Sequence, residues 1–158
     1  MFSFQRTYDQ FRAQFNSLLV QYEFTGACML PELQSQLVNQ VSTFSVALND
    51  VSKMVAVLDS DDNQSIKKLT IILGARHLQQ KYIVQTGAIN TLLVRALTNN
   101  ARKDSDYIFV VDMMAQAIHK FTRLGRRPVQ LGQQDENADY TCSLNATGLW
   151  FAVRLKNI

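Results

Sequence analysis

Apolar side chains recur at steps of three and four residues along most of the chain, which is the spacing of one face of an α-helix. The first such run includes Phe4, Tyr8, Phe11 and Phe15. Polar or glycine-containing breaks separate it from further runs of the same kind. The pattern predicts helices over residues 4–22, 31–58, 66–78, 86–98 and 105–124.

The longest of these runs is residues 31–58. Its apolar positions alternate steps of four and three, as at Leu37, Val41 and Phe44. Pro31 suits the first turn of a helix because its φ is already helical, and the acidic residue after it favours the positive end of the helix dipole. A seam of this kind packs on a core or pairs with a helix of another protein.

The pattern changes after Pro128. Residues 130–139 are polar and are predicted to form a loop. Residues 140–144 and 149–155 then alternate between apolar and polar side chains around a turn-forming tetrapeptide, which predicts a β-hairpin. We therefore expect an all-α fold with a small C-terminal β-hairpin: a helical domain over residues 1–127 and an extension over residues 128–158.

Composition and charge limit the classes of function. The 158 residues carry 16 basic and 13 acidic side chains, for a net charge of +3. Because the basic residues are dispersed, apart from Arg123, Arg126 and Arg127, we expect no nucleic-acid partner. The two cysteines, Cys28 and Cys142, form no CxxC motif and are expected to be free thiols in a reducing compartment. No segment is predicted to be a signal peptide or a membrane span, so we expect a cytoplasmic protein without a membrane partner.

His77 is the main candidate for chemistry. It ends the predicted helix 66–78 in the segment Leu73-Gly74-Ala75-Arg76-His77, and a second apolar helical run follows it. A neutral imidazole in this position can ligate a metal through one nitrogen. The alternative is a histidine whose positive charge stabilises the negative end of the helix dipole.

The segment around His77 resembles the globin helix that supplies the proximal haem ligand. Leu92-Leu93 resembles the next helix of that family, and Leu58-Asp59 resembles the end of its long distal helix. Tyr8, with Tyr22 fourteen residues later, resembles the bacterial globin pattern of a distal tyrosine and an aromatic residue that packs on the haem. The chain departs from the family in its shortened first helix and in its last thirty residues.

The resemblance implies a globin-like fold that binds haem b through His77. It places Tyr8, Thr43 and Ala47 on the distal side, with Gln40 as the alternative if the register shifts. Arg76 and Lys81 would pair with the haem propionates. The remaining cofactor contacts would come from Tyr22, Phe44, Leu73, Ile83 and Leu93.

Such a protein would bind a diatomic gas reversibly, for storage or sensing, or would transfer electrons through its iron. The sequence contains no GxSxG, HExxH or phosphate-binding glycine loop, so we do not expect an enzyme. The alternative is a haem-free helical module that acts by protein–protein contact. In that case a homodimer, formed through the 31–58 seam or the edge of the hairpin, would cover the apolar surface that the shortened first helix exposes.

Overall fold

The structure, a computed structural model, describes residues 7–32, 43–59, 64–98, 107–134 and 138–156. These residues form three α-helices, one 3-10 turn and six β-strands. In chain order the elements are α1 (Tyr8–Gln21), β1 (Thr43–Ala47), β2 (Ser52–Leu58), β3 (Ile66–Gly74), η2 (Ala75–His77), α2 (Gln80–Leu97), α3 (Ile108–Arg123), β4 (Val129–Gln134), β5 (Ala138–Asn145) and β6 (Gly148–Leu155).

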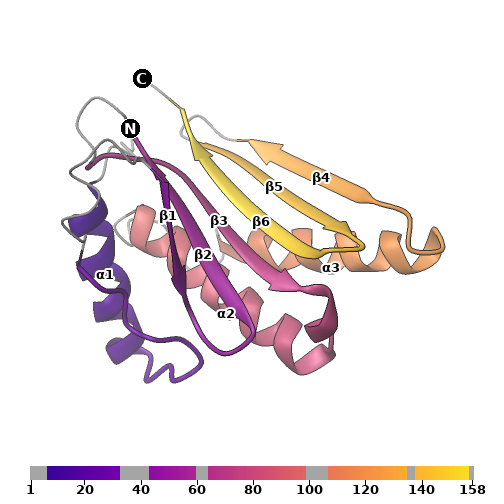
Figure 1. Cartoon of the computed structure of the whole chain (residues 1–158), viewed down its shortest axis with the longest axis horizontal. Coiled ribbons are helices and arrows are strands. Elements are labelled where there is room, and N and C mark those ends of the chain that lie inside the picture. The colour runs from indigo at the N-terminus through magenta and orange to yellow at the C-terminus, as the bar shows by residue number, and fades with distance from the viewer. Residues whose placement is uncertain (1–6, 33–42, 60–63, 99–106, 135–137, 157–158) are drawn as a thin grey trace.

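The six strands form one sheet in the order β1-β2-β3-β6-β5-β4. Strands β1 to β3 make one antiparallel meander, strands β4 to β6 make a second, and β3 joins them by pairing antiparallel with β6. All three helices lie on the same side of this sheet (Figure 1). We call that side the covered face. The other side, on which none of the described helices packs, is the open face.

The core lies between the helices and the covered face. Along β3, Leu69, Ile71 and Leu73 are each at most 2% exposed, whereas their neighbours point to the open face. Successive strand residues point to opposite sides of a sheet, so this alternation assigns each strand position to a face. From α1, Phe11 and Phe15 are fully buried in the same core.

The first helix begins at a well-formed cap. The hydroxyl of Thr7 accepts a hydrogen bond from the Gln10 backbone amide at 3.2 Å, and the Gln10 side chain accepts one from the Thr7 amide at 3.1 Å. This reciprocal capping box satisfies amide groups that a helix start otherwise leaves without partners. It fixes the residue at which α1 begins.

The prediction of an all-α, globin-like fold is wrong, because the described residues form a six-stranded antiparallel sheet in addition to three helices. Within the predicted helix 31–58, the described residues form β1 and β2, and within the predicted helix 66–78 they form β3 and η2. The apolar residues in these segments belong to two faces of a sheet. Phe44, for example, packs on the core, whereas Val55 and Ile72 lie on the open face.

A turn closed by the Asn49 side chain explains much of the difference between the predicted helix and the observed strands. The Asn49 side-chain oxygen accepts hydrogen bonds from the Val51 and Ser52 amides at 2.9 and 2.8 Å. Side chains of asparagine that bond to the backbone two or three residues onward close turns and compete with helix formation. The chain therefore reverses direction between β1 and β2 instead of continuing as a helix.

Other predictions fare differently. Helices α1 and α3 confirm the helices predicted over 4–22 and 105–124, although residues 1–6 and 99–106 lie outside the described part. The helix predicted over 86–98 exists, but it begins at Gln80. The hairpin is confirmed as β5 and β6. The loop predicted over 130–139 is wrong, because residues 130–134 belong to strand β4 and residues 138 and 139 belong to strand β5.

The two predicted parts of the chain share one sheet, since β3 comes from residues before 127 and β6 from residues after it.

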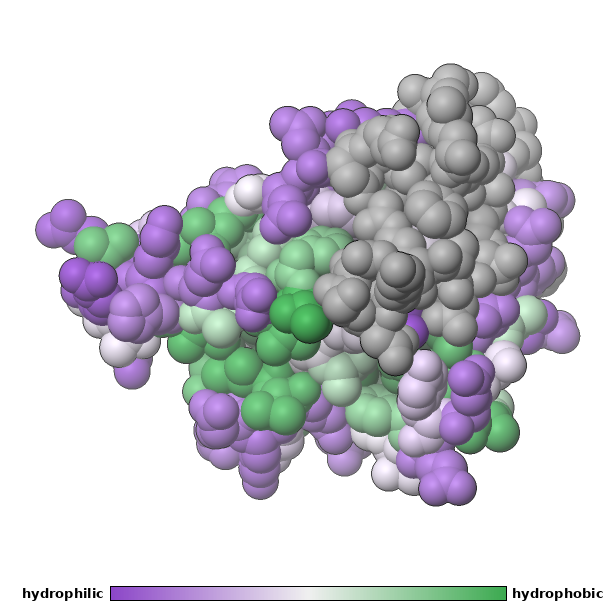
Figure 2. Space-filling model, turned by 180° about the vertical axis from the view of Figure 1, so that it is seen from behind, coloured by the Kyte–Doolittle hydropathy of each residue, from purple (hydrophilic) through white to green (hydrophobic). Residues whose placement is uncertain are grey.

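Among the described helices, none has the length and apolar character needed to cross a membrane. On the helix side, Figure 2 shows hydrophobic residues at the surface. Val84 of α2 and Val111 of α3, which are 61% and 48% exposed, lie on this side.

Candidate functional site

The strand register arranges the open face as a grid of three rows that cross the sheet. The middle row has small side chains, with Thr70, Ala152, Thr141 and Gly132 on successive strands β3, β6, β5 and β4. The row on one side of it is charged or polar, and contains Lys68, Arg154, Asp139 and Gln134. The row on the other side contains Ile72, Trp150, Ser143 and Gln130.

A groove follows from this arrangement, because short side chains leave space between two rows of longer ones. Two adjoining hollows of about 580 and 450 Å³ lie over the middle row. They share Lys68, Gln130, Thr141 and Ala152 as lining residues, so they form one continuous depression. Its size is within the range of pockets that hold small ligands.

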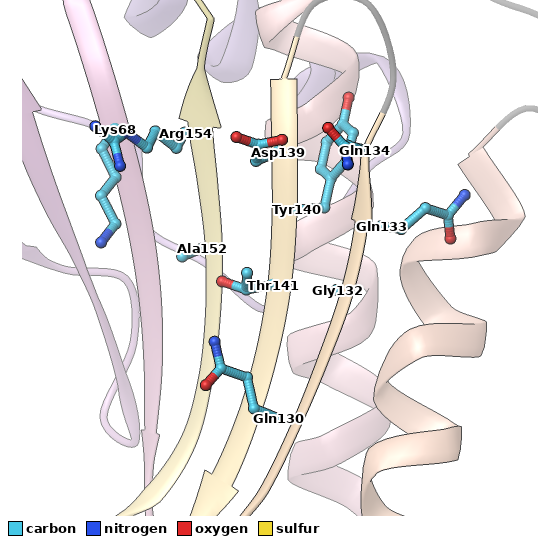
Figure 3. Close-up of a pocket in the computed structure, with 10 residues that line it drawn as sticks. All are labelled: Lys68, Gln130, Gly132, Gln133, Gln134, Asp139, Tyr140, Thr141, Ala152 and Arg154. Carbon is cyan, nitrogen blue, oxygen red and sulfur yellow. The ribbon is translucent and has the colours of Figure 1, made fainter.

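The charged side of the groove is the most unusual feature of the sheet. Lys68 of β3 and Arg154 of β6 lie directly opposite each other in the register, and Figure 3 shows their side chains next to each other. Like charges in a direct cross-strand pair destabilise a sheet. Neither side chain has a hydrogen bond or ion pair with any residue that the structure describes.

The one carboxylate in this row forms its ion pair with a lysine other than Lys68. Asp139 is the cross-strand neighbour of Arg154, but its carboxylate makes an ion pair with Lys156 at 3.8 Å. The Lys156 ammonium also donates a hydrogen bond to the Gln134 side chain at 3.1 Å. The Asp139 carboxylate is thus paired with Lys156, and within the described ranges no carboxylate forms an ion pair with Lys68 or Arg154.

The opposite side of the groove is apolar and aromatic on β3 and β6, and polar on β5 and β4. Trp150 is the single tryptophan of the chain and is 38% exposed. It lies across from Ile72 of β3, and both line the smaller hollow together with Val55 of β2. The hydroxyl groups of Thr70 and Thr141 lie in the middle row between the two sides, and Ser143 lies beside Trp150. The groove can therefore receive a ligand with a negative end and a flat or apolar body.

A further hollow of about 410 Å³ lies between the helices and the tip of the β5–β6 hairpin. Its walls are mainly apolar and include Leu78, Ile83, Ile118 and Phe121, with Arg126 as its one charged lining residue. It lacks the juxtaposed cations of the open-face groove. We therefore regard the groove as the stronger candidate site.

The residues predicted as a haem pocket lie in separate places. Tyr8 and Phe44 meet in the core, with ring centroids 5.0 Å apart, and the Tyr8 hydroxyl donates a hydrogen bond to the Pro31 carbonyl at 2.8 Å. Burial raises the pKa of Tyr8 to about 12, with Arg12 lowering it and Asp9 raising it to smaller extents. Tyr8 is therefore a neutral core residue whose polar group already has a partner.

His77 belongs to the 3-10 turn η2 rather than to the end of an α-helix. Its ring packs edge-on against Tyr82 with centroids 5.6 Å apart, and the Lys81 ammonium lies 4.7 Å from the centre of the Tyr82 ring. Arg76, in the same turn, is exposed. His77, Arg76 and Lys81 thus lie near one another in the chain. The Tyr82 ring contacts both the His77 ring and the Lys81 ammonium.

The remaining predicted contacts are scattered. Thr43 and Ala47 are exposed on β1, whereas Leu73 and Leu93 are buried in the core. Tyr22 follows α1 and lies 5.7 Å from the Arg95 guanidinium. Gln40 lies outside the described residues. Ile83 lines the hollow near the hairpin.

The described residues do not fit the haem pocket that the globin resemblance implies, because they do not converge on a common cavity with His77. Across the described ranges, no three His, Cys, Asp or Glu side chains form a group that could hold a metal ion. The two cysteines are free thiols, and burial raises the pKa of Cys142 from its ordinary 9.0 to about 12. A thiol with this pKa stays protonated at neutral pH and is a poor nucleophile.

The sequence did contain a signal for half of the groove. The predicted hairpin alternates sides, so Trp150, Ala152 and Arg154 had to share one face with Thr141 and Ser143. Lys68 could not be added to them, because its segment was predicted to be helical. The cationic pair exists only through the pairing of β3 with β6, which sequence periodicity does not specify.

Comparison of the chain with protein-family models, with curated proteins and with solved structures gives no match. The geometry of the groove is therefore the basis for a function of this protein.

Proposed function

We propose that this protein is a non-catalytic binding protein whose open-face groove holds a small anionic ligand with a flat or apolar body. The observation that carries this proposal is the direct opposition of Lys68 and Arg154, neither of which forms an ion pair with a carboxylate among the described residues. A feature that violates a local rule of sheet stability, without a visible structural gain, is typical of a functional site.

A phosphate or carboxylate between Lys68 and Arg154 would remove the repulsion and receive charge-assisted hydrogen bonds. The guanidinium of arginine can hold two oxygens of such a group at once, whereas lysine acts as a point charge. The anion would therefore occupy the charged side of the groove, and its negative charge would offset the two positive ones.

The rest of the ligand would lie over the middle row. Ala152 and Thr141 leave room for a flat body, and Trp150 provides an aromatic side wall. Stacking or edge contact with an aromatic residue adds to the free energy gained by burying apolar area. The threonine and serine hydroxyls can then distinguish ligands by their polar groups.

The single tryptophan allows a direct test. Adenosine monophosphate and naphthoate each combine a flat body with an anion, one a phosphate and the other a carboxylate. Titration of either compound should change the emission of Trp150, and calorimetry should give the same dissociation constant. Adenosine without its phosphate should bind at least about tenfold more weakly than the monophosphate, since a hydrogen bond to a charged group contributes about 1.5–3 kcal/mol.

Variants locate the site. Lys68→Gln and Arg154→Gln should each weaken binding about tenfold or more. Lys53→Gln is the matched control, because Lys53 is on the same face of the sheet but does not line the groove. Equal weakening by all three variants, or the absence of a fluorescence change and of heat with every probe, would contradict the proposal.

We keep the expectation that nucleic acid is not the partner. Single-stranded nucleic acids bind to surfaces that combine a basic track with several stacking aromatics. Among the paired positions of the open face, Trp150 is the one aromatic residue and Asp139 interrupts the basic row. If a single-stranded oligonucleotide bound more tightly than the mononucleotide, this expectation would be wrong.

A cytoplasmic location and haem binding stay predictions from the sequence. A cytoplasmic location agrees with the free thiols of Cys28 and Cys142. Haem binding and a diatomic gas ligand are inferred from a globin-like fold, and the chain does not have that fold. Reconstitution with haemin, followed by a search for a stoichiometric Soret band that depends on His77, would test haem binding directly.

A further inference from the structure

Strand β4 forms one edge of the sheet. It pairs with β5 along its full length, from Val129 opposite Leu144 to Gln134 opposite Asp139. No other strand among the described residues pairs with its outer side. An edge strand presents backbone amides and carbonyls that another strand can bind.

This edge lacks the features by which proteins usually prevent pairing. Its sequence, Val-Gln-Leu-Gly-Gln-Gln, contains no charged residue and no proline, and its pairing with β5 shows no shift of register. Natural edge strands are commonly protected by lysines, by prolines or by bulges. An unprotected edge of six residues is long enough to support a ladder of hydrogen bonds.

The composition of the strand favours a second copy of itself. Glutamine side chains both donate and accept hydrogen bonds, so Gln130, Gln133 and Gln134 can bond to polar groups of a facing strand from another chain. In the sequence, Arg126 and Arg127 precede the strand, and two acidic residues follow it. Antiparallel pairing of two identical strands brings the basic start of each one near the acidic end of the other. The segments that flank β1 have no such charge pattern.

We propose that two copies of this protein pair antiparallel through β4, about a two-fold axis perpendicular to the sheet. An interface between identical strands related by such an axis closes on itself, so the assembly stops at the dimer. The axis keeps the open faces of both copies on the same side. The two six-stranded sheets then form one sheet of twelve strands, with both helix layers on the other side.

This arrangement concerns the groove as well as the edge. Gln130, Gly132 and Gln134 line the groove and belong to β4. The dimer places the β4 of the second copy beside these residues, so the two grooves approach each other across the axis. The inference does not depend on the proposed ligand, because pairing uses the backbone of the edge strand.

Light scattering coupled to size-exclusion chromatography tests the dimer over a range of concentrations. The wild-type chain should have the mass of a dimer. The double variant Gln130→Lys/Gln133→Lys adds two positive charges to each edge and should give a monomer. The matched control, Thr43→Lys/Ser45→Lys, adds the same charges to two exposed positions of the opposite edge strand and should stay dimeric. Circular dichroism establishes that both variants are folded.

A cross-linking experiment then tests the register. In a symmetric antiparallel pair, only the residue on the axis lies opposite its own copy, and the Cα separation there of about 4.5–5.5 Å permits a disulfide. With Cys28 changed to serine, single cysteines at positions 130, 131 and 132 should give one efficient cross-link among the three.

Three results would overturn the proposal. These are a monomeric wild-type chain at every concentration, dissociation caused by the β1 lysines instead of the β4 lysines, and open-ended assemblies larger than a dimer. Comparable cross-linking at all three positions would also contradict it, because a fixed two-fold axis passes beside only one of these residues.

Discussion

The two faces of the sheet differ in whether their side chains have favourable partners. On the covered face, apolar residues such as Leu73, Cys142 and Phe151 pack against the helices with at most 1% of their surface exposed. On the open face, Lys68 and Arg154 lie opposite each other without a counter-ion among the described residues. The same strands supply both arrangements at alternating positions.

This difference shows how one sheet can separate stability from binding. Burial of apolar area is the main favourable contribution to folding, and it comes from the covered face. The open face contributes less to folding, so it can hold unfavourable pairs that a ligand would relieve. Substitutions on the two faces should therefore have different, and in one case opposite, effects.

The largest effect should come from a pair of neighbours on β6. Phe151→Ala removes a side chain that is 1% exposed and leaves a cavity, which should lower the free energy of unfolding by about 3–5 kcal/mol. Trp150→Ala, one residue earlier and on the open face, should cost about 1 kcal/mol or less. Urea unfolding followed by circular dichroism measures both. Equal losses would show that the open face is also part of a packed core.

A second effect should appear in alkaline solution and should come from the covered face. The folded protein keeps the Cys142 thiol protonated until about pH 12, whereas the unfolded chain loses that proton near pH 9.0. The unfolded state is therefore favoured as the pH rises between these values, and full stability is present only below pH 9.0. The slope is about 1.4 kcal/mol per pH unit and the total is on the order of 4 kcal/mol.

The same pH range provides the controls. The raised pKa of Tyr8 acts in the same direction above its ordinary value of 10.0. Cys142→Ala should make the dependence of unfolding free energy on pH shallower, and a variant of the exposed Cys28 should not. At about pH 8, a thiol reagent should modify Cys28 rapidly and Cys142 slowly in the folded protein. Rapid modification of both thiols would mean that the interior of the sheet opens readily.

The smallest effect should have the opposite sign. Lys68→Glu converts a like-charged cross-strand pair with Arg154 into an opposite-charged one, which should stabilise the ligand-free protein by about 0.2–1 kcal/mol. The same variant should lose binding of the anionic probes. Lys53→Glu, whose cross-strand neighbours are Ile72 and Ala47, should do neither. A loss of stability in Lys68→Glu would mean that the lysine is held by contacts other than its charge.

The helices and the terminal hairpin could be predicted from the sequence, because each depends on short-range signals. Helices α1 and α3 have clear three- and four-residue spacing, and β5 and β6 alternate around a tight turn. Strands β1 to β3 could not be recognised in this way. Apolar residues lie on both faces of these strands. Taken together along the sequence, the residues of the two faces have the three- and four-residue spacing of a helix.

The candidate site was harder to predict than the fold elements. Lys68 and Arg154 are far apart in the sequence and become neighbours only through the β3–β6 pairing. His77, which the local pattern favours, is a half-buried residue that packs on Tyr82. Local periodicity identifies which residues form a face, but the partner strand decides which residues on that face meet.

The join between the two meanders has a consequence for how the chain folds. Gly148 has a φ of +141°, and a side chain there would overlap the Leu73 carbonyl oxygen, so β3 and β6 meet very closely at this end. Every other strand pair connects neighbours in the chain, and such hairpins form in microseconds. Pairing β3 with β6 instead requires closing a long loop that contains α2 and α3. We expect each meander to be a local folding unit, and the zipping of β3 to β6 to set the overall folding rate.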